Sequence, residues 1–394
     1  MTGARRLANG TRRSLRDLVA VGPKHRLATG RIGGSRDHRR VMIGNRPDRS
    51  PATPPEESID LATIPEGASR RRVLVTGGSG FIGTNVVEAF LRDAYVVLNV
   101  DIAPPKVAAH APSWRQLDIL DDVALRRAFA AFRPELVIHL AAKTVLDERT
   151  TLDHFAANIQ GVQNVIDAVQ AAGSVERTFF ASSRLVCRLG YEPRDDTDYQ
   201  PSTLYGLSKV RGEQLVRVSS SLGTWTILRP TGIWGPWFGV PYRDFFNTIR
   251  RGRYVHPARR EARKSYGYVE NTVHQLQRLA ARPPADVHGR TLVVADYPPL
   301  RVREWAELIR DALGARPIRS VPVPLLKGAA IAGDAVERFG LGHAPLTSFR
   351  LNNLVSDMVY DTSPLEALVG PLPYTLTQGV ERTVAWLRDG EAPR

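Results

Sequence analysis

The sequence predicts an α/β fold in which helices cover both faces of a doubly wound parallel sheet. From Arg70 onward, short apolar runs rich in β-branched residues alternate with segments of helical periodicity. Repeated βαβ units produce this pattern. The first run leads at once into a glycine-rich turn and a helical segment. No internal repeat is visible, so a solenoid is not expected.

The first βα unit lies in residues 73–83, which read VLVTGGSGFIG. We expect a strand over 73–76 and a helix over 81–93, joined by a turn that contains Gly77, Gly80 and Gly83. Glycine permits positive φ and lets the backbone approach a pyrophosphate, while the helix N-terminus directs free N–H groups at the anion. The unit therefore predicts a Rossmann-type dinucleotide site.

The second strand, expected over 95–100, leads directly to Asp101. A carboxylate about 20 residues past the glycines is placed to accept hydrogen bonds from ribose hydroxyls. It would repel a 2′-phosphate, and the following Ile102 and Ala103 offer no cation to bind one. The sequence therefore predicts NAD rather than NADP, with a solvated loop residue as the alternative interpretation of Asp101.

The later elements follow the same alternation. Asp121 and Asp122 suit the positive end of the helix that they begin. The expected elements are a strand near 113–117, a helix over 121–132, a strand over 135–142, a helix over 151–172, a strand over 178–183, a helix over 203–221 and a strand over 224–230. After Pro236 the alternation weakens, which predicts a dinucleotide-binding domain over 70–235 and a smaller, mixed substrate-binding region over 236–394, interleaved with it.

The chain has 394 residues and a formal net charge of +14, but the excess lies near its start. Residues 1–50 hold 13 lysines and arginines against 3 aspartates, which accounts for +10 of that charge. We expect a disordered basic tail over 1–69, since this segment lacks apolar periodicity and contains a Pro-rich stretch. A transit peptide, a nucleic-acid arm and a translated leader are the alternatives. For the folded core we expect no nucleic-acid partner.

Composition excludes several further classes of protein. No run of 18 apolar residues occurs, so no membrane span is expected. The single cysteine, Cys187, excludes an intramolecular disulfide and suits a reducing compartment, so we expect a cytoplasmic protein. His139 and His256 have no partners at metal-ligand spacing, so we expect no metal.

The pair Tyr205 and Lys209 gives a second chemical signal. Residues four apart share one face of a helix, so the ammonium of Lys209 could lower the tyrosine pKa from near 10 and prepare proton transfer. Ser202 is placed to cap this helix. Ser183 ends an apolar strand, where its hydroxyl could hold the reacting oxygen. The alternatives are a surface pair for Tyr205 and Lys209, and loop capping for Ser182 and Ser183.

Together these motifs resemble the extended short-chain dehydrogenase/reductase family, especially its NAD-dependent epimerase/dehydratase branch acting on nucleotide sugars. The resemblance covers about residues 71–390, with the motifs in the family's order. They are TGGSGFIG (76–83), LDIL (117–120), HLAA (139–142), NIQGVQNV (158–165), ASS (181–183), YGLSK (205–209), LRPTGIWGP (228–236) and YVEN (268–271).

The resemblance implies a catalytic trio of Ser183, Tyr205 and Lys209, with Lys209 also holding the nicotinamide ribose. It implies that NAD binds to Gly77, Gly80, Phe81, Ile82, Gly83, Asp101, Asp118, Ile119, Leu140, Ala141, Ala142, Asn158, Tyr205 and Lys209. Relatives place residues facing the nucleotide diphosphate just before YVEN, where this chain has a basic segment, 250–264. The candidate substrate ligands are therefore Lys143, Ser183, Arg259, Arg260, Arg263 and Lys264. A solvated charge run is the alternative for the basic segment.

Departures from the family's pattern narrow the reaction. Its 4,6-dehydratases and decarboxylases place acidic residues just after the catalytic Ser or Thr, whereas Arg184, Leu185 and Val186 follow Ser183 here. We therefore expect no dehydration. Thr231 stands where the branch usually has Asn, which leaves the sugar-binding side open.

The sequence thus predicts an NAD-dependent epimerase or oxidoreductase that acts on a hydroxyl of a nucleotide-activated sugar through a keto intermediate. The sequence leaves open whether the protein forms a homodimer. The first alternative is a hydroxysteroid or other lipid-alcohol dehydrogenase, because residues 321–333 and 374–387 resemble that branch about as well. Basic residues facing the site would favour a diphosphate, and an apolar pocket from 321–335 would favour a lipid. A non-catalytic NAD-sensing protein is the second alternative, and the intact trio argues against it.

Overall fold

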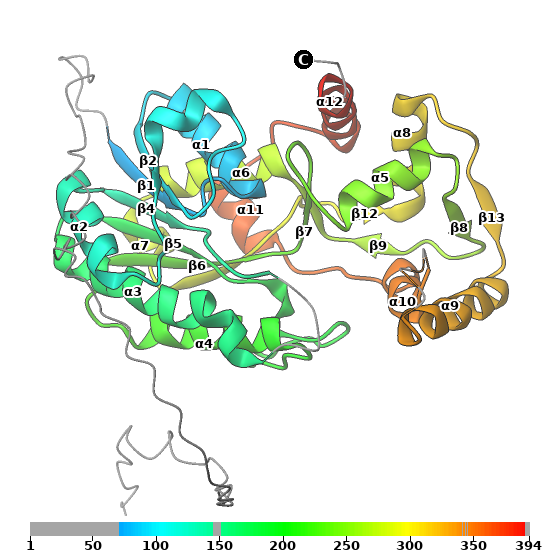
Figure 1. Cartoon of the computed structure of the whole chain (residues 1–394), viewed down its shortest axis with the longest axis horizontal. Coiled ribbons are helices and arrows are strands. Elements are labelled where there is room, and N and C mark those ends of the chain that lie inside the picture. The colour runs from blue at the N-terminus through cyan, green and yellow to red at the C-terminus, as the bar shows by residue number, and fades with distance from the viewer. Residues whose placement is uncertain (1–70, 145–150, 341, 343, 345, 391–394) are drawn as a thin grey trace, which may run out of the picture. The chain divides into compact units, whose positions relative to one another are not determined.

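The computed structural model describes residues 71–144, 151–340, 342, 344 and 346–390 (Figure 1). The predicted basic tail over 1–69 lies outside these residues. All the described residues belong to one compact unit, Ile59–Arg394.

A seven-stranded parallel sheet forms the centre of this unit. Its strands are β1 (Arg72–Thr76), β2 (Val96–Asp101), β3 (Trp114–Gln116), β4 (Leu136–His139), β5 (Arg177–Ala181), β6 (Thr224–Pro230) and β11 (Arg290–Val294). They lie side by side in the order β11-β6-β5-β4-β1-β2-β3, and every pairing is parallel. The predicted doubly wound α/β fold is confirmed. The order reverses between β1 and β4, which places a topological switch point there.

Helices cover the sheet on both faces (Figure 1). One layer consists of α1 (Phe81–Arg92), α6 (Val269–Ala281) and α11 (Ser363–Val369), and the other of α2 (Asp122–Phe132), α3 (Ala156–Ala172) and α4 (Leu204–Val218). Strand β1 serves both layers, because Val73 and Val75 pack with the first layer while Leu74 packs with the second. This alternation is the period-two pattern of a strand that is buried on both faces.

Several boundaries differ from the sequence prediction. The expected helix over 151–172 is a 3₁₀ turn, Leu152–Phe155, followed by α3. The helix with the Tyr–Lys pair begins one residue later than expected, and its N-cap is Thr203, whose hydroxyl accepts a hydrogen bond from the Gly206 N–H at 3.0 Å. The predicted cap, Ser202, was wrong. Two further 3₁₀ turns are Ala108–Ser113 and Arg184–Val186.

The remaining elements come from the chain after Pro230. They are β7 (Gly232–Trp234), α5 (Tyr242–Arg250), β8 (Val255–Pro257), β9 (Arg263–Lys264), β10 (Tyr266–Tyr268), α7 (Pro284–Val287), β12 (Leu300–Arg301), α8 (Val302–Leu313), β13 (Arg319–Val321), α9 (Val323–Arg338), α10 (Ser348–Val355) and α12 (Leu376–Asp389). A second core of buried aromatic side chains holds many of them together, centred on Trp234, Phe246, Tyr268 and Trp305. None of the described helices is long and apolar enough to span a bilayer.

The chain returns to the sheet after it has built part of this second core. Strand β11 pairs with β6, and α6 and α11 pack on the same face as α1. The ranges 70–235 and 236–394 are therefore sequence segments that share the sheet, and their status as domains stays a prediction.

Candidate active site

A cavity of about 920 Å³ lies beyond the carboxyl ends of the central strands. Its wall includes Gly77 after β1, Leu140 after β4, Ser183 after β5 and Thr231 after β6. Open α/β sheets bind their ligands at such a switch point. The predicted site residues that line the cavity are Gly77, Gly80, Phe81, Ile82, Gly83, Leu140, Ala142, Ser183, Tyr205 and Lys209.

The glycine turn has no room for larger side chains. Gly77 has a φ of +74°, and a Cβ added to Gly83 would lie 2.1 Å from the Gly77 carbonyl oxygen. Gly80 is the N-cap of α1, and no side chain caps this helix by a hydrogen bond. The N–H groups of its first turn can therefore bind an anion. The turn fits the pyrophosphate of a dinucleotide.

Asp101, the last residue of β2, lies directly beside the glycine turn. One carboxylate oxygen accepts a hydrogen bond from the Ser79 N–H and the other from the Ala103 N–H, each at 3.0 Å. The carboxylate is thus fixed against the turn, next to the cavity rather than in its wall. Its contact with the ribose stays a prediction.

Four other predicted cofactor residues do not line the cavity. Asp118 accepts a hydrogen bond from the Leu120 N–H at 2.9 Å, and Ile119 is buried. Ala141 lies behind the turn, where a Cβ on Gly77 would be 2.6 Å from its backbone nitrogen. The fourth residue, Asn158, is treated next.

Asn158 supports the cleft from behind. It is fully buried, and its amide accepts from the Lys143 N–H at 2.8 Å and donates to the Lys143 carbonyl at 2.9 Å. The same amide donates to the Ser208 hydroxyl at 2.8 Å. Asn158 therefore joins the segment after β4 to α4, and the prediction that it contacts the cofactor is not supported by this geometry. The Lys143 side chain is exposed and does not line the cavity.

The predicted trio converges at the wall of the cavity. Tyr205 and Lys209 lie on α4, and both are buried. The Ser183 side chain lies close enough to Tyr205 to lower the pKa of its hydroxyl, and the Ser183 hydroxyl accepts from the Leu185 N–H at 3.1 Å. The Lys209 ammonium donates to the carbonyl of Ala181 at 2.8 Å. The helix and the end of β5 thus hold the three side chains together.

Burial controls the ionisation of this pair. It raises the pKa of Tyr205, an effect that the hydrogen bond to Ser183 reduces. It also lowers the pKa of Lys209 to about 8, against the attraction of the Glu213 carboxylate. The sequence prediction that Lys209 lowers the pKa of Tyr205 is not what this structure shows, because desolvation of the phenol dominates.

The basic segment does not reach the cavity. Arg259, Arg260, Arg263 and Lys264 are all absent from its wall. Lys264 is buried, and its ammonium donates to two backbone carbonyls, those of Asn353 and Ser356. The prediction that it binds a substrate diphosphate was wrong. Arg263 lies on the exposed side of β9, 3.9 Å from the carboxylate of Asp357.

Sequence reasoning missed another part of the wall. The cavity is also lined by Lys106, Trp237, Tyr242, Arg243 and Trp386. Trp237 packs against Trp386, with ring centroids 5.5 Å apart, and the guanidinium of Arg243 lies 5.9 Å from the Trp386 ring. Among the described residues, Lys106, Lys209 and Arg243 supply the cations of the wall.

Arg184 follows Ser183, where the resemblance implies an acid in dehydratases. It is buried, its guanidinium lies 4.2 Å from the centre of the Tyr360 ring, and it donates to the Tyr191 carbonyl at 2.9 Å. No carboxylate of the described residues lines the cavity. Nor do the described residues contain a group of three His, Cys, Asp or Glu able to hold a metal.

Comparison with known proteins agrees with the family resemblance of the sequence motifs. The model of the NAD dependent epimerase/dehydratase family matches residues 73–295. The 3 beta-hydroxysteroid dehydrogenase/Delta 5→4-isomerase of Mycobacterium tuberculosis (strain ATCC 25618 / H37Rv) is 28% identical over 328 residues, which are 78% of this chain and 87% of that protein. The N-acetyl-alpha-D-glucosaminyl-diphospho-ditrans,octacis-undecaprenol 4-epimerase of Escherichia coli O157:H7 is 27% identical over 322 residues, 80% of this chain and 94% of that protein.

Solved structures show the same fold. The UDP-glucose 4-epimerase of Thermotoga maritima with UDP-glucose matches with a TM-score of 0.63 and 22% identity, over 81% of this chain and 99% of that one. The UDP-glucose 4-epimerase of Thermus thermophilus in complex with NAD matches with a TM-score of 0.61 and 22% identity, over 82% of this chain and 100% of that one.

Proposed function

The chain belongs to the NAD-dependent epimerase/dehydratase family and is an NAD-dependent enzyme, and we propose that it oxidises a hydroxyl of a nucleotide-activated sugar to a keto intermediate. The observation that carries this proposal is the convergence of Ser183, Tyr205 and Lys209 at the wall of the cavity that the glycine turn also lines. In an epimerase the intermediate is reduced again on its other face, and in a dehydrogenase it is released.

Each member of the trio has a role that follows from its position. Ser183 holds the substrate hydroxyl beside Tyr205, whose pKa its side chain already lowers. Tyr205 removes the hydroxyl proton, and Lys209, one helical turn away on the same helix, is held against the Ala181 carbonyl at the end of β5. The glycine turn and Lys209 would hold NAD, which when bound accepts hydride from the carbon. Elimination of water needs an acid near Ser183, and the buried Arg184 does not provide one.

Lys106 and Arg243 are the residues that favour a sugar diphosphate. Both line the cavity, and a guanidinium or an ammonium is the ordinary protein ligand of phosphate. They take the place of the basic segment as the proposed diphosphate ligands. The relatives that are epimerases of sugar diphosphates are consistent with this substrate class.

A hydroxysteroid or other lipid alcohol is the second candidate substrate. It is favoured by the mycobacterial relative, which carries the name of a steroid dehydrogenase, and by the aromatic wall that Phe81, Trp237, Phe238 and Trp386 form. The apolar segment over 321–335 does not contribute to this wall, because α9 packs instead on α10 through Leu326. An apolar pocket from 321–335, which would have favoured a lipid, is therefore not part of this cavity.

The test is a substrate panel with the full chain. NAD is incubated with nucleotide sugars or with 3β-hydroxysteroids, while the absorbance of the reduced cofactor and the ratio of sugar epimers are recorded. Epimer formation without accumulation of reduced cofactor supports the proposal, and oxidation of a steroid alone replaces it with the second candidate.

Tyr205→Phe tests the chemistry on whichever substrate is turned over. Turnover should fall by about 10²- to 10⁴-fold, the usual value of general acid–base catalysis, while NAD affinity changes little. Tyr254→Phe is the matched control, since the Tyr254 hydroxyl lies 3.0 Å from His256 Nδ1 and outside the cavity. Full turnover by Tyr205→Phe would refute the assignment.

A further inference from the structure

We propose that Glu213 is a positioning residue, which acts through its buried contacts with Ser182 and Arg229 to hold the proposed trio in place. This inference rests on the proposed function of the same site. Glu213 lies on α4, one helical turn beyond Lys209, and its side chain is 1% exposed. It does not line the cavity, so it acts on the reaction only through other groups.

Three consecutive residues connect the end of β5 to α4. The carbonyl of Ala181 accepts from Lys209 at 2.8 Å, the hydroxyl of Ser182 donates to Glu213 at 2.5 Å, and the Ser183 side chain interacts with Tyr205 and lowers its pKa. The outer two contacts involve the proposed trio, and the middle one does not. The Ser182–Glu213 contact therefore fixes the strand end against the helix at the point where the other two must align.

The carboxylate of Glu213 also accepts hydrogen bonds from Arg229 and Tyr199. Arg229 on β6 donates to it from Nε at 2.8 Å and from Nη2 at 2.7 Å. The hydroxyl of Tyr199 donates at 2.9 Å. A buried carboxylate is tolerated only when it is paired and hydrogen-bonded in this way. Two-point pairing with an arginine also fixes its orientation.

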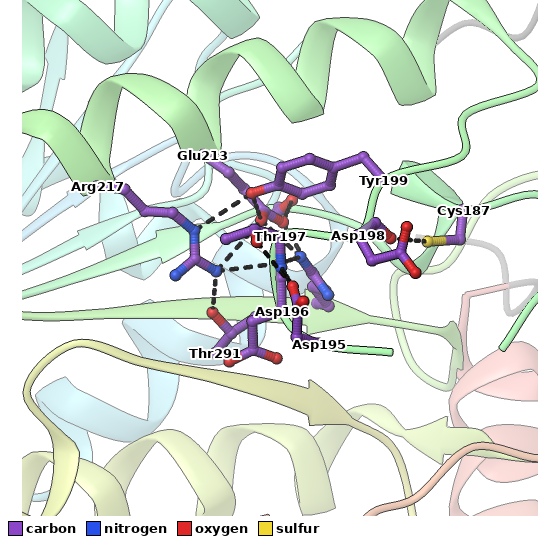
Figure 2. A network of polar contacts seen from close by, with 11 residues as sticks. Cys187, Asp195, Asp196, Thr197, Asp198, Tyr199, Glu213, Arg217 and Thr291 are labelled. Carbon is purple, nitrogen blue, oxygen red and sulfur yellow. Dashed lines mark hydrogen bonds and ion pairs between the residues drawn. The ribbon is translucent and has the colours of Figure 1, made fainter. Parts of the chain in front are cut away.

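The network extends from Glu213 to the chain segment 195–199 and to the edge of the sheet (Figure 2). Arg217 donates to the Tyr199 hydroxyl at 3.2 Å and to the Thr291 hydroxyl, on β11. Arg217 also donates to the Asp196 carbonyl at 3.3 Å, to which Arg229 donates at 2.6 Å. Helix α4 is thus held to three elements besides β5, and a change at Glu213 loosens the anchor nearest Lys209.

Glu213 also acts on Lys209 by its charge. Its attraction opposes the desolvation that lowers the lysine pKa. The other ionisable groups near this ammonium are Tyr205 and His139, whose pKa burial and Lys209 lower to about 3, so that its ring is neutral. Arg229 faces Glu213 from β6 and offsets part of its charge. Removing the carboxylate should therefore lower the pKa of Lys209 further.

The experiment compares Glu213→Gln with the wild-type full chain. Glu270→Gln is the matched control, because Glu270 also accepts from a tyrosine hydroxyl and pairs with an arginine, Tyr268 and Arg382, but lies on α6 rather than on the helix that carries Tyr205 and Lys209. Glu213→Gln should lower kcat by about 10- to 100-fold with little change in KM or NAD affinity, since small displacements of catalytic groups cost this much. An unchanged kcat in a folded Glu213→Gln protein overturns the proposal.

A second readout needs no substrate. Carbon-13 NMR of lysine-labelled protein follows the titration of Lys209, whose resonance is assigned by its loss in Lys209→Met. Glu213→Gln should shift this pKa downward from about 8, whereas Glu270→Gln should leave it unchanged. Equal pKa values in wild type and Glu213→Gln overturn the proposal. If instead no panel substrate reacts but the pKa shifts, the proposed function fails and the action of the Glu213 charge on Lys209 stands.

Ser182→Ala covers the case in which Glu213→Gln does not fold. It keeps the buried ion pair and removes only the hydroxyl that joins β5 to Glu213. We expect kcat to fall roughly 3- to 10-fold at constant KM, the value of one hydrogen bond. Wild-type kcat in Ser182→Ala would refute the positioning role.

Discussion

His139 should make the folded chain sensitive to acid. It ends β4 and is fully buried, with Nδ1 2.7 Å from the Thr76 hydroxyl. Nε2 is buried and has no hydrogen-bond partner among the described residues. Burial, helped by the nearby ammonium of Lys209, lowers the pKa of His139 from 6.5 to about 3. The imidazole is therefore neutral throughout the working range of the fold.

The size of the effect follows from this shift. In the unfolded chain His139 binds a proton below about pH 6.5, whereas in the folded chain it does so only below about pH 3. Its contribution to the free energy of unfolding is complete above pH 6.5 and is lost as the pH falls through this window. Each pH unit in this window changes the free energy of unfolding by about 1.4 kcal/mol, so a fall from pH 6.5 to pH 4.5 lowers it by roughly 2.7 kcal/mol.

Urea denaturation of the full chain at pH 7 and pH 4.5 measures this contribution. His139→Asn can keep a polar contact with Thr76 but cannot titrate, so its free energy of unfolding should fall by roughly 2 to 3 kcal/mol less than that of the wild type. Any cost of the cavity left by the ring is present at both pH values and cancels in this difference.

The control is His288→Asn, since His288 is an exposed histidine. This variant should lose as much stability as the wild type between the two pH values. Burial raises the pKa of Asp296 to about 7, which makes the free energy of unfolding rise as the pH falls. This contribution is the same in the wild type and in both variants. An equal loss in His139→Asn and wild type would refute the reasoning.

Two further predictions concern the cofactor. NAD should bind more tightly than NADP, because the carboxylate fixed beside the glycine turn repels a 2′-phosphate. Asp101→Ala should therefore narrow the difference between the two Kd values. Tighter binding of NADP by the wild type would show that Asp101 has another role. Gly83→Ala should greatly weaken NAD binding in a calorimetric titration, since its Cβ would lie 2.1 Å from the Gly77 carbonyl oxygen. Gly328→Ala, on α9 with open space around the added Cβ, is the control, and equal NAD affinity in both variants would contradict the close-packed turn.

The parts of the site that could be predicted from the sequence are those encoded locally. The glycine turn needs only a strand, three glycines and a helix in succession, and the predicted turn with Gly77, Gly80 and Gly83 lines the cavity. The spacing of Tyr205 and Lys209 fixes their common helix face in the same way. The parallel sheet follows in the same way, because strands that alternate with helices form βαβ units.

The parts that could not be predicted depend on partners distant in the chain. The sequence shows that Lys264 is charged, but not that its ammonium is bound by carbonyls of residues 353 and 356. Trp386 reaches the cavity from the last helix, and no local pattern connects it with Trp237. The pKa of Tyr205 is a further case, since the depth of burial that raises it is a property of the tertiary structure.

The two sequence criteria for the substrate both pointed to segments that the fold places elsewhere. Neither the basic segment nor the apolar segment over 321–335 lines the cavity. The wall beyond the trio and the glycine turn includes instead residues of the chain between Pro230 and Arg243, together with Lys106 and Trp386. Two cations set among aromatic rings suit a ligand with an anionic group and an apolar or ring-shaped portion. The choice between a sugar diphosphate and a steroid therefore depends on whether Lys106 and Arg243 contact the substrate.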